Sequence, residues 1–165
     1  MKIVFLDIDG VLNRSHPVTM QAPSGVRGIE DPLVENLAGL IRQAKADIVL
    51  TSDWKVGWCA DPAKCSADAR YLDRKMADHG LCIMGKTYDN CVFDEYYTCR
   101  GTGIRKFLDD KRGVDGYVVL DDHDFMDFDA GIREHFVKTN SLDGLTKEKA
   151  EEALRILNNG RGGMR

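Results

Sequence analysis

The chain has 165 residues, a length typical of a single domain that can bury a core of its own. A hydrophobic content of 43% and a charged content of 30% are those of an ordinary globular protein, and they exclude a disordered chain. The formal net charge of −4 argues against a protein that coats nucleic acid through bulk electrostatics, although it allows the binding of one phosphorylated end.

The first predicted element is a strand over the apolar residues 3–6, and it ends abruptly in two acids, Asp7 and Asp9. Because side chains two residues apart in an extended chain point to the same side, the two carboxylates are expected to lie close together. They would repel each other without a cation between them. Oxygen ligands favour a hard divalent ion, so this stretch predicts a Mg²⁺ site.

The start of the chain bears on where the protein works. Met1 and Lys2 lead directly into the strand, without a separate basic and apolar leader. No apolar run approaches the ~18 residues of a membrane span. We therefore expect a soluble, cytoplasmic protein that makes no membrane contact.

Residues 13–28 are predicted to form a loop. Gly10 permits a backbone conformation that other residues resist, and the polar stretch 13–28 contains two prolines and two glycines. Open α/β sheets bind their ligands at the carboxyl ends of the strands, so we expect this loop to lie over the site.

A βαβ unit follows from the next pattern. Asp31 is predicted to cap a helix that begins at Pro32, lays one apolar face on the sheet and ends near Lys45. A second apolar strand over residues 48–50 ends in Thr51 and Ser52. A strand, a crossover helix and a second strand indicate a parallel sheet.

The periodicity weakens after Trp54, and we interpret residues 56–99 as an insertion or an irregular wall near the site. A helix over residues 67–79 and a short strand over residues 81–84 are predicted within it. The middle of the chain also holds five cysteines, whose odd number and spacing favour free thiols over disulfides or zinc ligands: Cys59, Cys65, Cys82, Cys91 and Cys99.

Clear signals return after the cysteines. A helix is predicted over residues 100–110, and the apolar residues 117–120 predict a third strand that again ends in acids, Asp121 and Asp122. Residues 135–137 suggest one more strand, and Thr146 is predicted to cap a last helix over residues 147–157 before a frayed tail. We expect one domain over residues 1–165.

Four segments, in this order, carry a resemblance to a known family. They are FLDIDGVL, IVLTSDWK, a basic residue before the third strand, and YVVLDD. With them the chain resembles the haloacid dehalogenase-like (HAD) superfamily of phosphotransferases, and more narrowly the HAD phosphatase domains associated with RNA repair. The resemblance covers most of the chain except the middle insertion. It implies a three-layer, Rossmann-like α/β fold, with helices on both faces of a parallel sheet and a minimal cap domain or none.

The resemblance also implies roles for the residues at the strand ends. Asp7 would be the nucleophile that forms an aspartyl-phosphate, and Asp9 would protonate the leaving oxygen and then deprotonate the attacking water. The hydroxyl of Thr51 would hydrogen-bond a phosphoryl oxygen, with Ser52 close enough in sequence to exchange for it. Taken alone, either hydroxyl would more often be a cap or turn residue.

The same resemblance implies a Mg²⁺ ion held by the carboxylate of Asp7, the backbone carbonyl of Asp9 and an acid of the Asp121–Asp122 pair, of which we favour Asp122. Such an ion shields the anionic nucleophile from an anionic substrate. The acids that follow at positions 124, 127 and 129 are interpreted as a solvated loop, with Asp127 the first exception to consider.

Basic residues complete the implied site. Arg100, just before the helix that leads to the third strand, is our first choice for the cation that stabilises the phosphoryl group, and Lys106 is the alternative. Lys55 matches a basic position after the second motif and is predicted to contact substrate phosphate, as is Gly10. For the indoles at positions 54 and 58, packing is a more common role than stacking on a base.

The functional expectation is a Mg²⁺-dependent phosphomonoesterase that acts on a nucleic-acid end phosphate or a nucleotide, as a polynucleotide phosphatase does. Two alternatives remain open. One is a phosphatase for another small phosphorylated metabolite, and the other is a non-catalytic module that keeps the fold and binds phosphate. No obligatory protein partner is inferred.

Overall fold

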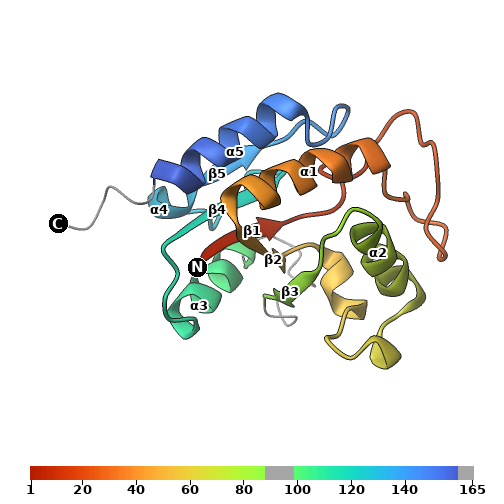
Figure 1. Ribbon diagram of the computed structural model, residues 1–165, viewed down its shortest axis with the longest axis horizontal. Coiled ribbons are helices and arrows are strands. Elements are labelled where there is room, and N and C mark those ends of the chain that lie inside the picture. The colour runs from red at the N-terminus through yellow and green to blue at the C-terminus, as the bar shows by residue number, and fades with distance from the viewer. Residues whose placement is uncertain (88–98, 160–165) are drawn as a thin grey trace.

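The computed structural model describes residues 1–87 and 99–159 and contains a five-stranded sheet (Figure 1). The strands stand in the order β3-β2-β1-β4-β5, and every neighbouring pair is parallel. The first strand of the chain therefore lies at the centre of the sheet. The strand bounds are β1 Lys2–Leu6, β2 Ala46–Leu50, β3 Ile83–Lys86, β4 Gly116–Asp121 and β5 Phe136–Lys138.

Helices cover both faces of the sheet, as Figure 1 shows for α1 and α5 on one side and α3 on the other. The helices are α1 Asp31–Ala44, α2 Ala67–Asp78, α3 Arg100–Asp110, α4 Ala130–Arg133 and α5 Lys147–Asn159, with two short 3₁₀ helices, η1 Asp53–Gly57 and η2 Pro62–Lys64. This arrangement confirms the predicted three-layer, Rossmann-like α/β fold.

The central strand supplies both halves of the core, because its side chains alternate between the two faces. Val4 and Leu6 belong to the cluster that α1, α2 and α5 complete, whereas Ile3 and Phe5 belong to the cluster of α3 and α4. All four are fully buried. An unbroken apolar run is what a parallel strand covered on both faces requires.

The start of α1 differs from the prediction. Asp31 was expected at the N-cap, but Glu30 occupies that position and Asp31 is the first helical residue. Neither carboxylate caps the helix in the expected way. Glu30 is 6% exposed and binds Arg14, whose Nη2 lies 2.6 Å from its Oε1, while Asp31 pairs with Lys75 of α2. Both carboxylates therefore form ion pairs with residues from other segments instead of capping the helix.

The middle of the chain contains regular structure as far as it is described. Helix α2 and strand β3 lie within residues 56–99, and α2 begins with Ser66 as its N-cap. Cys59, Cys65, Cys82 and Cys99 are free thiols. Cys91, the rest of segment 88–98 and the tail 160–165 lie outside the described residues.

Two smaller observations complete the comparison with the prediction. The hydroxyl of Thr146 accepts a hydrogen bond from the backbone N–H of Lys149 at 3.2 Å, which confirms the predicted cap of α5. Within residues 1–87 and 99–159, no helix combines the length and the apolar character that a bilayer crossing requires.

Candidate active site

Three neighbouring strands end level with one another, which brings their next residues to one edge. Leu6 of β1 is in register with Leu50 of β2 and with Leu120 of β4. The backbone pairing continues one step further, since the N–H of Asp7 donates to the carbonyl of Leu120 at 3.0 Å and that of Thr51 to the carbonyl of Leu6 at 2.9 Å. Polar side chains from distant parts of the sequence therefore meet at the carboxyl edge of the sheet.

A cavity of about 340 Å³ opens at this edge. Carboxylates dominate its lining, and one guanidinium faces them. The lining residues are Asp7, Asp9, Ser52, Asp53, Arg100, Asp121, Asp122, His123 and Phe125.

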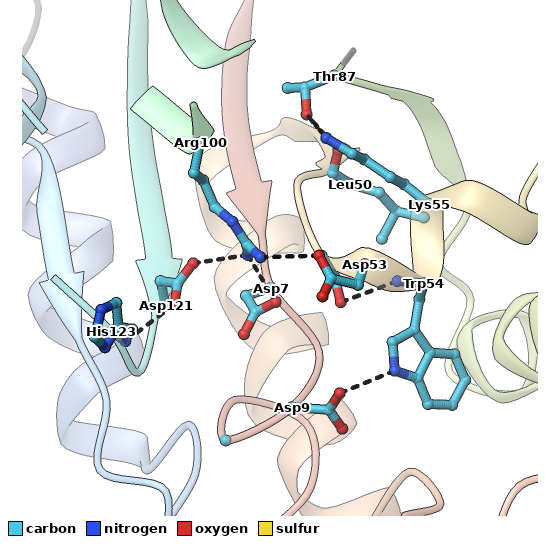
Figure 2. A network of polar contacts seen from close by, with 12 residues as sticks. Asp7, Asp9, Leu50, Asp53, Trp54, Lys55, Thr87, Arg100, Asp121 and His123 are labelled. Carbon is cyan, nitrogen blue, oxygen red and sulfur yellow. Dashed lines mark hydrogen bonds and ion pairs between the residues drawn. The ribbon is translucent and has the colours of Figure 1, made fainter. Parts of the chain in front are cut away.

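Arg100, the first residue of α3, ties the acids together (Figure 2). Its Nη1 lies 2.9 Å from Oδ1 of Asp7 and 3.0 Å from Oδ2 of Asp121, and its Nη2 lies 3.4 Å from Oδ1 of Asp53. The ring of Phe125 packs 4.5 Å from the guanidinium carbon. Burial works against the charge of Arg100, but Asp7 and Asp121 outweigh it and hold its pKa above the ordinary value. The arginine therefore stays charged.

The acids Asp7, Asp121 and Asp122 form a compact group in which one oxygen of each lies within 4.8 Å of the others. Burial raises the pKa of Asp7 to about 6 even though Arg100 lowers it, and the nearby charges of Asp122 and Asp9 raise it further. Burial likewise raises the pKa of Asp121 and of Asp122. Ionising all three neighbouring carboxyl groups is unfavourable unless a cation lies between them. Their oxygen atoms are therefore a ligand set suited to a hard divalent cation.

Gly10 explains how Asp122 comes so close. Its backbone adopts a φ of +77°, and a Cβ atom at this position would overlap the Asp122 carboxylate. Its carbonyl accepts a hydrogen bond from the buried hydroxyl of Thr139 at 2.8 Å. The glycine therefore makes room for a metal-ligand candidate, whereas its predicted contact with substrate stays a prediction.

Asp9 is held by two neutral donors at the mouth of the cavity. Nδ2 of Asn13 donates to its Oδ1 at 2.8 Å. Nε1 of Trp54 donates to its Oδ2 at 3.2 Å, as Figure 2 shows. Asn13 also accepts from the N–H of Gly10 at 3.0 Å, which fixes the turn that carries the acid. The hydrogen bonds of this carboxylate thus come from neutral donors, and its arginine contact, with Nη2 of Arg27 at 3.9 Å, is longer than the one that holds Asp7.

The two hydroxyls after β2 are placed differently. Ser52 lines the cavity and its side chain caps η1 by accepting from the N–H of Trp54 at 3.4 Å. Thr51 is 1% exposed, and its Oγ1 has no hydrogen-bond partner among the described residues. A buried hydroxyl without a partner is costly, so Thr51 has an unused donor. Thr51 is not among the residues that line the cavity, and its hydrogen bond to a phosphoryl oxygen stays a prediction.

The remaining basic candidates lie elsewhere. The ammonium group of Lys55, a residue only 4% exposed, donates to the hydroxyl of Thr87 at 3.0 Å, as Figure 2 shows. Lys106 pairs with Asp110 one helical turn away at 3.0 Å. Of the two residues considered for the third motif, Arg100 is the one that the structure places on Asp7. The predicted phosphate contact of Lys55 stays a prediction.

Asp127, the acid that the sequence singled out as an exception to the solvated loop, supports the site. Asp127 accepts hydrogen bonds from the N–H groups of Gly101 at 2.9 Å and Thr102 at 2.7 Å, and so caps the helix that begins with Arg100. An acid placed against a helix N-terminus satisfies its open donors. Trp58 is buried and donates to Asp73, in keeping with the packing role expected for it. Asn13 and Asp53 had no recognisable signal beyond their closeness to the motifs.

The comparisons with known proteins agree with this site. The sequence profile described as the HAD domain in Swiss Army Knife RNA repair proteins matches residues 3–150. No curated protein and no solved structure matches the chain. The matched segment contains β2 to β5, all of β1 except Lys2, and all the residues that line the cavity. The chain therefore belongs to the family of HAD domains found in Swiss Army Knife RNA repair proteins, a HAD-type phosphatase family.

Proposed function

We propose that this protein is a Mg²⁺-dependent phosphomonoesterase that works through an aspartyl-phosphate intermediate. The observation that carries the proposal is the pair of acids on one cavity wall with different surroundings. Asp7 is buried against Arg100 and the acids of β4, whereas Asp9 is held by neutral donors. Two carboxylates in unlike environments are suited to unlike tasks.

In the first half-reaction a carboxylate oxygen of Asp7 attacks the phosphorus atom. The bond from phosphorus to the leaving oxygen breaks, and Asp9 donates a proton to that oxygen. In the second half-reaction Asp9 takes a proton from water, whose oxygen attacks the same phosphorus and releases inorganic phosphate from Asp7. Arg100 keeps the nucleophile oriented, because its Nη1 already holds Oδ1 of Asp7.

The carboxylates of Asp7, Asp121 and Asp122 are the residues that would hold Mg²⁺, together with the backbone carbonyl of Asp9. Their compact grouping and their raised pKa values support a divalent cation at this place. When bound, the cation neutralises charge between the acids and the substrate phosphoryl group.

The proposed substrate is a phosphorylated nucleic-acid end. Residues 10–30, which follow the nucleophile strand, contain no helix or strand that could form a separate cap over the cavity. A site covered by a loop can admit the end of a chain. The description of the matched family, which names RNA repair proteins, supports the same substrate class.

The mechanism is tested by replacing the two acids separately. Asp7→Asn keeps the shape but removes the nucleophile, and we expect it to abolish Mg²⁺-dependent hydrolysis of an aryl phosphate. Asp9→Asn is expected to lower turnover by about 10²- to 10⁴-fold, the usual contribution of a positioned acid and base. Asp78→Asn, on the exposed side of α2, is the matched control and should match the wild type.

Hydrolysis that survives Asp7→Asn would contradict the mechanism. The substrate class needs a separate panel: a 3′-phosphorylated oligonucleotide, its 5′ isomer and the mononucleotides. Faster turnover of an oligonucleotide supports the proposal, and equal rates would favour a small-metabolite phosphatase. Tight phosphate binding without any turnover would instead indicate a binding module.

A further inference from the structure

Arg27 stands beside the proposed acid with an unused hydrogen-bond donor. Its Nη2 lies 3.9 Å from Oδ1 of Asp9, which is too far for a hydrogen bond. Its Nη1 is buried and has no hydrogen-bond partner among the described residues. Both terminal nitrogens of Arg100, by contrast, already contact carboxylates. The two arginines of the site therefore differ in what they can still bind.

The backbone around Arg27 is fixed. Its carbonyl accepts from Nδ2 of Asn13 at 3.4 Å, and Gln21 and Arg27 form an antiparallel bridge across the loop. Two further contacts anchor the loop to α2. The N–H of Ile29 donates to the Tyr71 hydroxyl at 3.0 Å, and the Ser24 hydroxyl donates to Asp68 at 2.5 Å. Arg27 is therefore held in place beside the cavity.

In the free protein the Arg27 guanidinium forms an ion pair with Asp9 at 3.9 Å, but its buried Nη1 has no hydrogen-bond acceptor among the described residues. Asp9 already has Asn13 and Trp54 as hydrogen-bond donors, so it does not need Arg27 to satisfy its oxygens. The Arg27 side chain is 32% exposed, so part of the guanidinium is open to a ligand, and a ligand oxyanion would give its donors the charge-assisted hydrogen bonds that Asp9 does not supply. The forked donor set of arginine matches phosphate.

The position of Arg27 relative to Asp9 identifies which oxyanion it meets. In the proposed reaction Asp9 protonates the leaving oxygen, so the leaving group lies on the Asp9 side of the cavity. Arg27 borders that side, and Arg100 lies on the opposite side at the nucleophile. A phosphate that reaches Arg27 therefore belongs to the leaving group.

We infer that Arg27 binds the phosphate adjoining the one that is removed, so the substrate is the end of a nucleotide chain and the leaving group carries its own phosphate. This inference rests on the proposed phosphatase reaction and specifies its substrate. A second cation at this place also offsets the five carboxylates of the cavity lining, which would otherwise repel a substrate with two phosphates.

The smallest probe is a nucleoside 3′,5′-bisphosphate, because it carries the adjoining phosphate whichever end is hydrolysed. The measurement is kcat/KM for the bisphosphate divided by kcat/KM for the faster of the two monophosphates. We expect the wild type to prefer the bisphosphate, and Arg27→Gln to lower this ratio by about 10- to 100-fold, the usual range for a charge-assisted hydrogen bond. Arg27→Lys, which keeps the charge without the fork, should fall between them.

Arg74→Gln is the matched control, because it removes the same charge from the exposed side of α2. It should keep the ratio of the wild type. A ratio that Arg27→Gln leaves unchanged, or that Arg74→Gln lowers equally, would overturn the inference. If no substrate is hydrolysed, the proposed function has failed, and calorimetric titration of the bisphosphate into the wild type and Arg27→Gln still tests the arginine. Equal affinities of the wild type and Arg27→Gln for the bisphosphate would then overturn the inference about Arg27.

Discussion

Replacing Thr51 by valine should raise the free energy of unfolding and at the same time slow the proposed hydrolysis. The side chain is 1% exposed and its hydroxyl has no partner among the described residues. A buried hydroxyl without a hydrogen bond costs about 1–3 kcal/mol, and valine has nearly the same shape without that cost. We therefore expect Thr51→Val to raise the free energy of unfolding by about 1 kcal/mol.

The assay is urea denaturation of the metal-free protein, supported by thermal unfolding. A gain of this size corresponds to a rise in Tm of about 2–4 °C for a chain of this length. Thr139→Val is the matched control, because that threonine is equally buried but donates to the carbonyl of Gly10 at 2.8 Å. It should lose about 1–3 kcal/mol, since the carbonyl is left unpaired.

The same Thr51→Val protein should hydrolyse an aryl phosphate about 10- to 100-fold more slowly, because the hydroxyl can no longer donate to a phosphoryl oxygen. A Thr51→Val protein that is destabilised as much as Thr139→Val would refute the reasoning, since the hydroxyl would then have a partner in the free protein. Unchanged turnover would refute its assignment to the phosphoryl group and leave Ser52 as the ligand.

Three further substitutions test other parts of the structure. Gly10→Ala should destabilise by about 1–3 kcal/mol and slow turnover, because the positive φ is strained for alanine and its methyl group would displace Asp122. Asp127→Ala should cost about 1 kcal/mol and also slow turnover, since it removes the cap from the helix that carries the site arginine. His79→Gln should destabilise more at pH 6 than at pH 9. A hydrogen bond to Glu35 raises the pKa of His79, so its contribution is complete below the ordinary histidine pKa and disappears as the pH rises through the raised value.

Each of these has a control or a contrary outcome. Gly39→Ala, with open space around its Cβ, should stabilise α1 slightly, and an equal loss at both glycines would contradict the packing argument. Asp109→Ala, exposed at the other end of α3, should change little. A flat pH profile for His79→Gln would contradict the assigned ion pairs. Urea denaturation measures the stability of all these variants, and hydrolysis of an aryl phosphate measures turnover.

The strands and the acids at their ends were predictable because both follow from local chemistry. Short apolar runs on either side of one amphipathic helix indicate a parallel sheet, and parallel strands deliver their next residues to one edge. Asp7, Thr51 and Asp121 could therefore be expected together before any contact was known. The right-handed βαβ connection decides on which face of the sheet a crossover helix lies, but it does not fix the order of the strands.

The residues that orient the acids were not predictable, because their roles depend on contacts between distant segments. Trp54 reaches Asp9 across 45 positions of sequence, and Asp127 meets α3 across 26. The misplaced cap of α1 has the same cause. Both Glu30 and Asp31 fit a helix start next to proline, and only the arrival of Lys75 from α2 decides what Asp31 does.

The loop over residues 14–28 is attached to the protein differently from the catalytic acids. Asp7 and Asp121 stand on central strands of the sheet, whereas Ser24 and Ile29 tie the loop to α2, on the far side of β2. The proposed substrate contact thus has a support of its own on α2, and it is linked to the catalytic acids through Asn13, which donates to Asp9 and to the carbonyl of Arg27. Exchange of this loop between related chains would alter which ends are accepted and leave the reacting groups in place, which makes it the natural segment to transplant when a new specificity is sought.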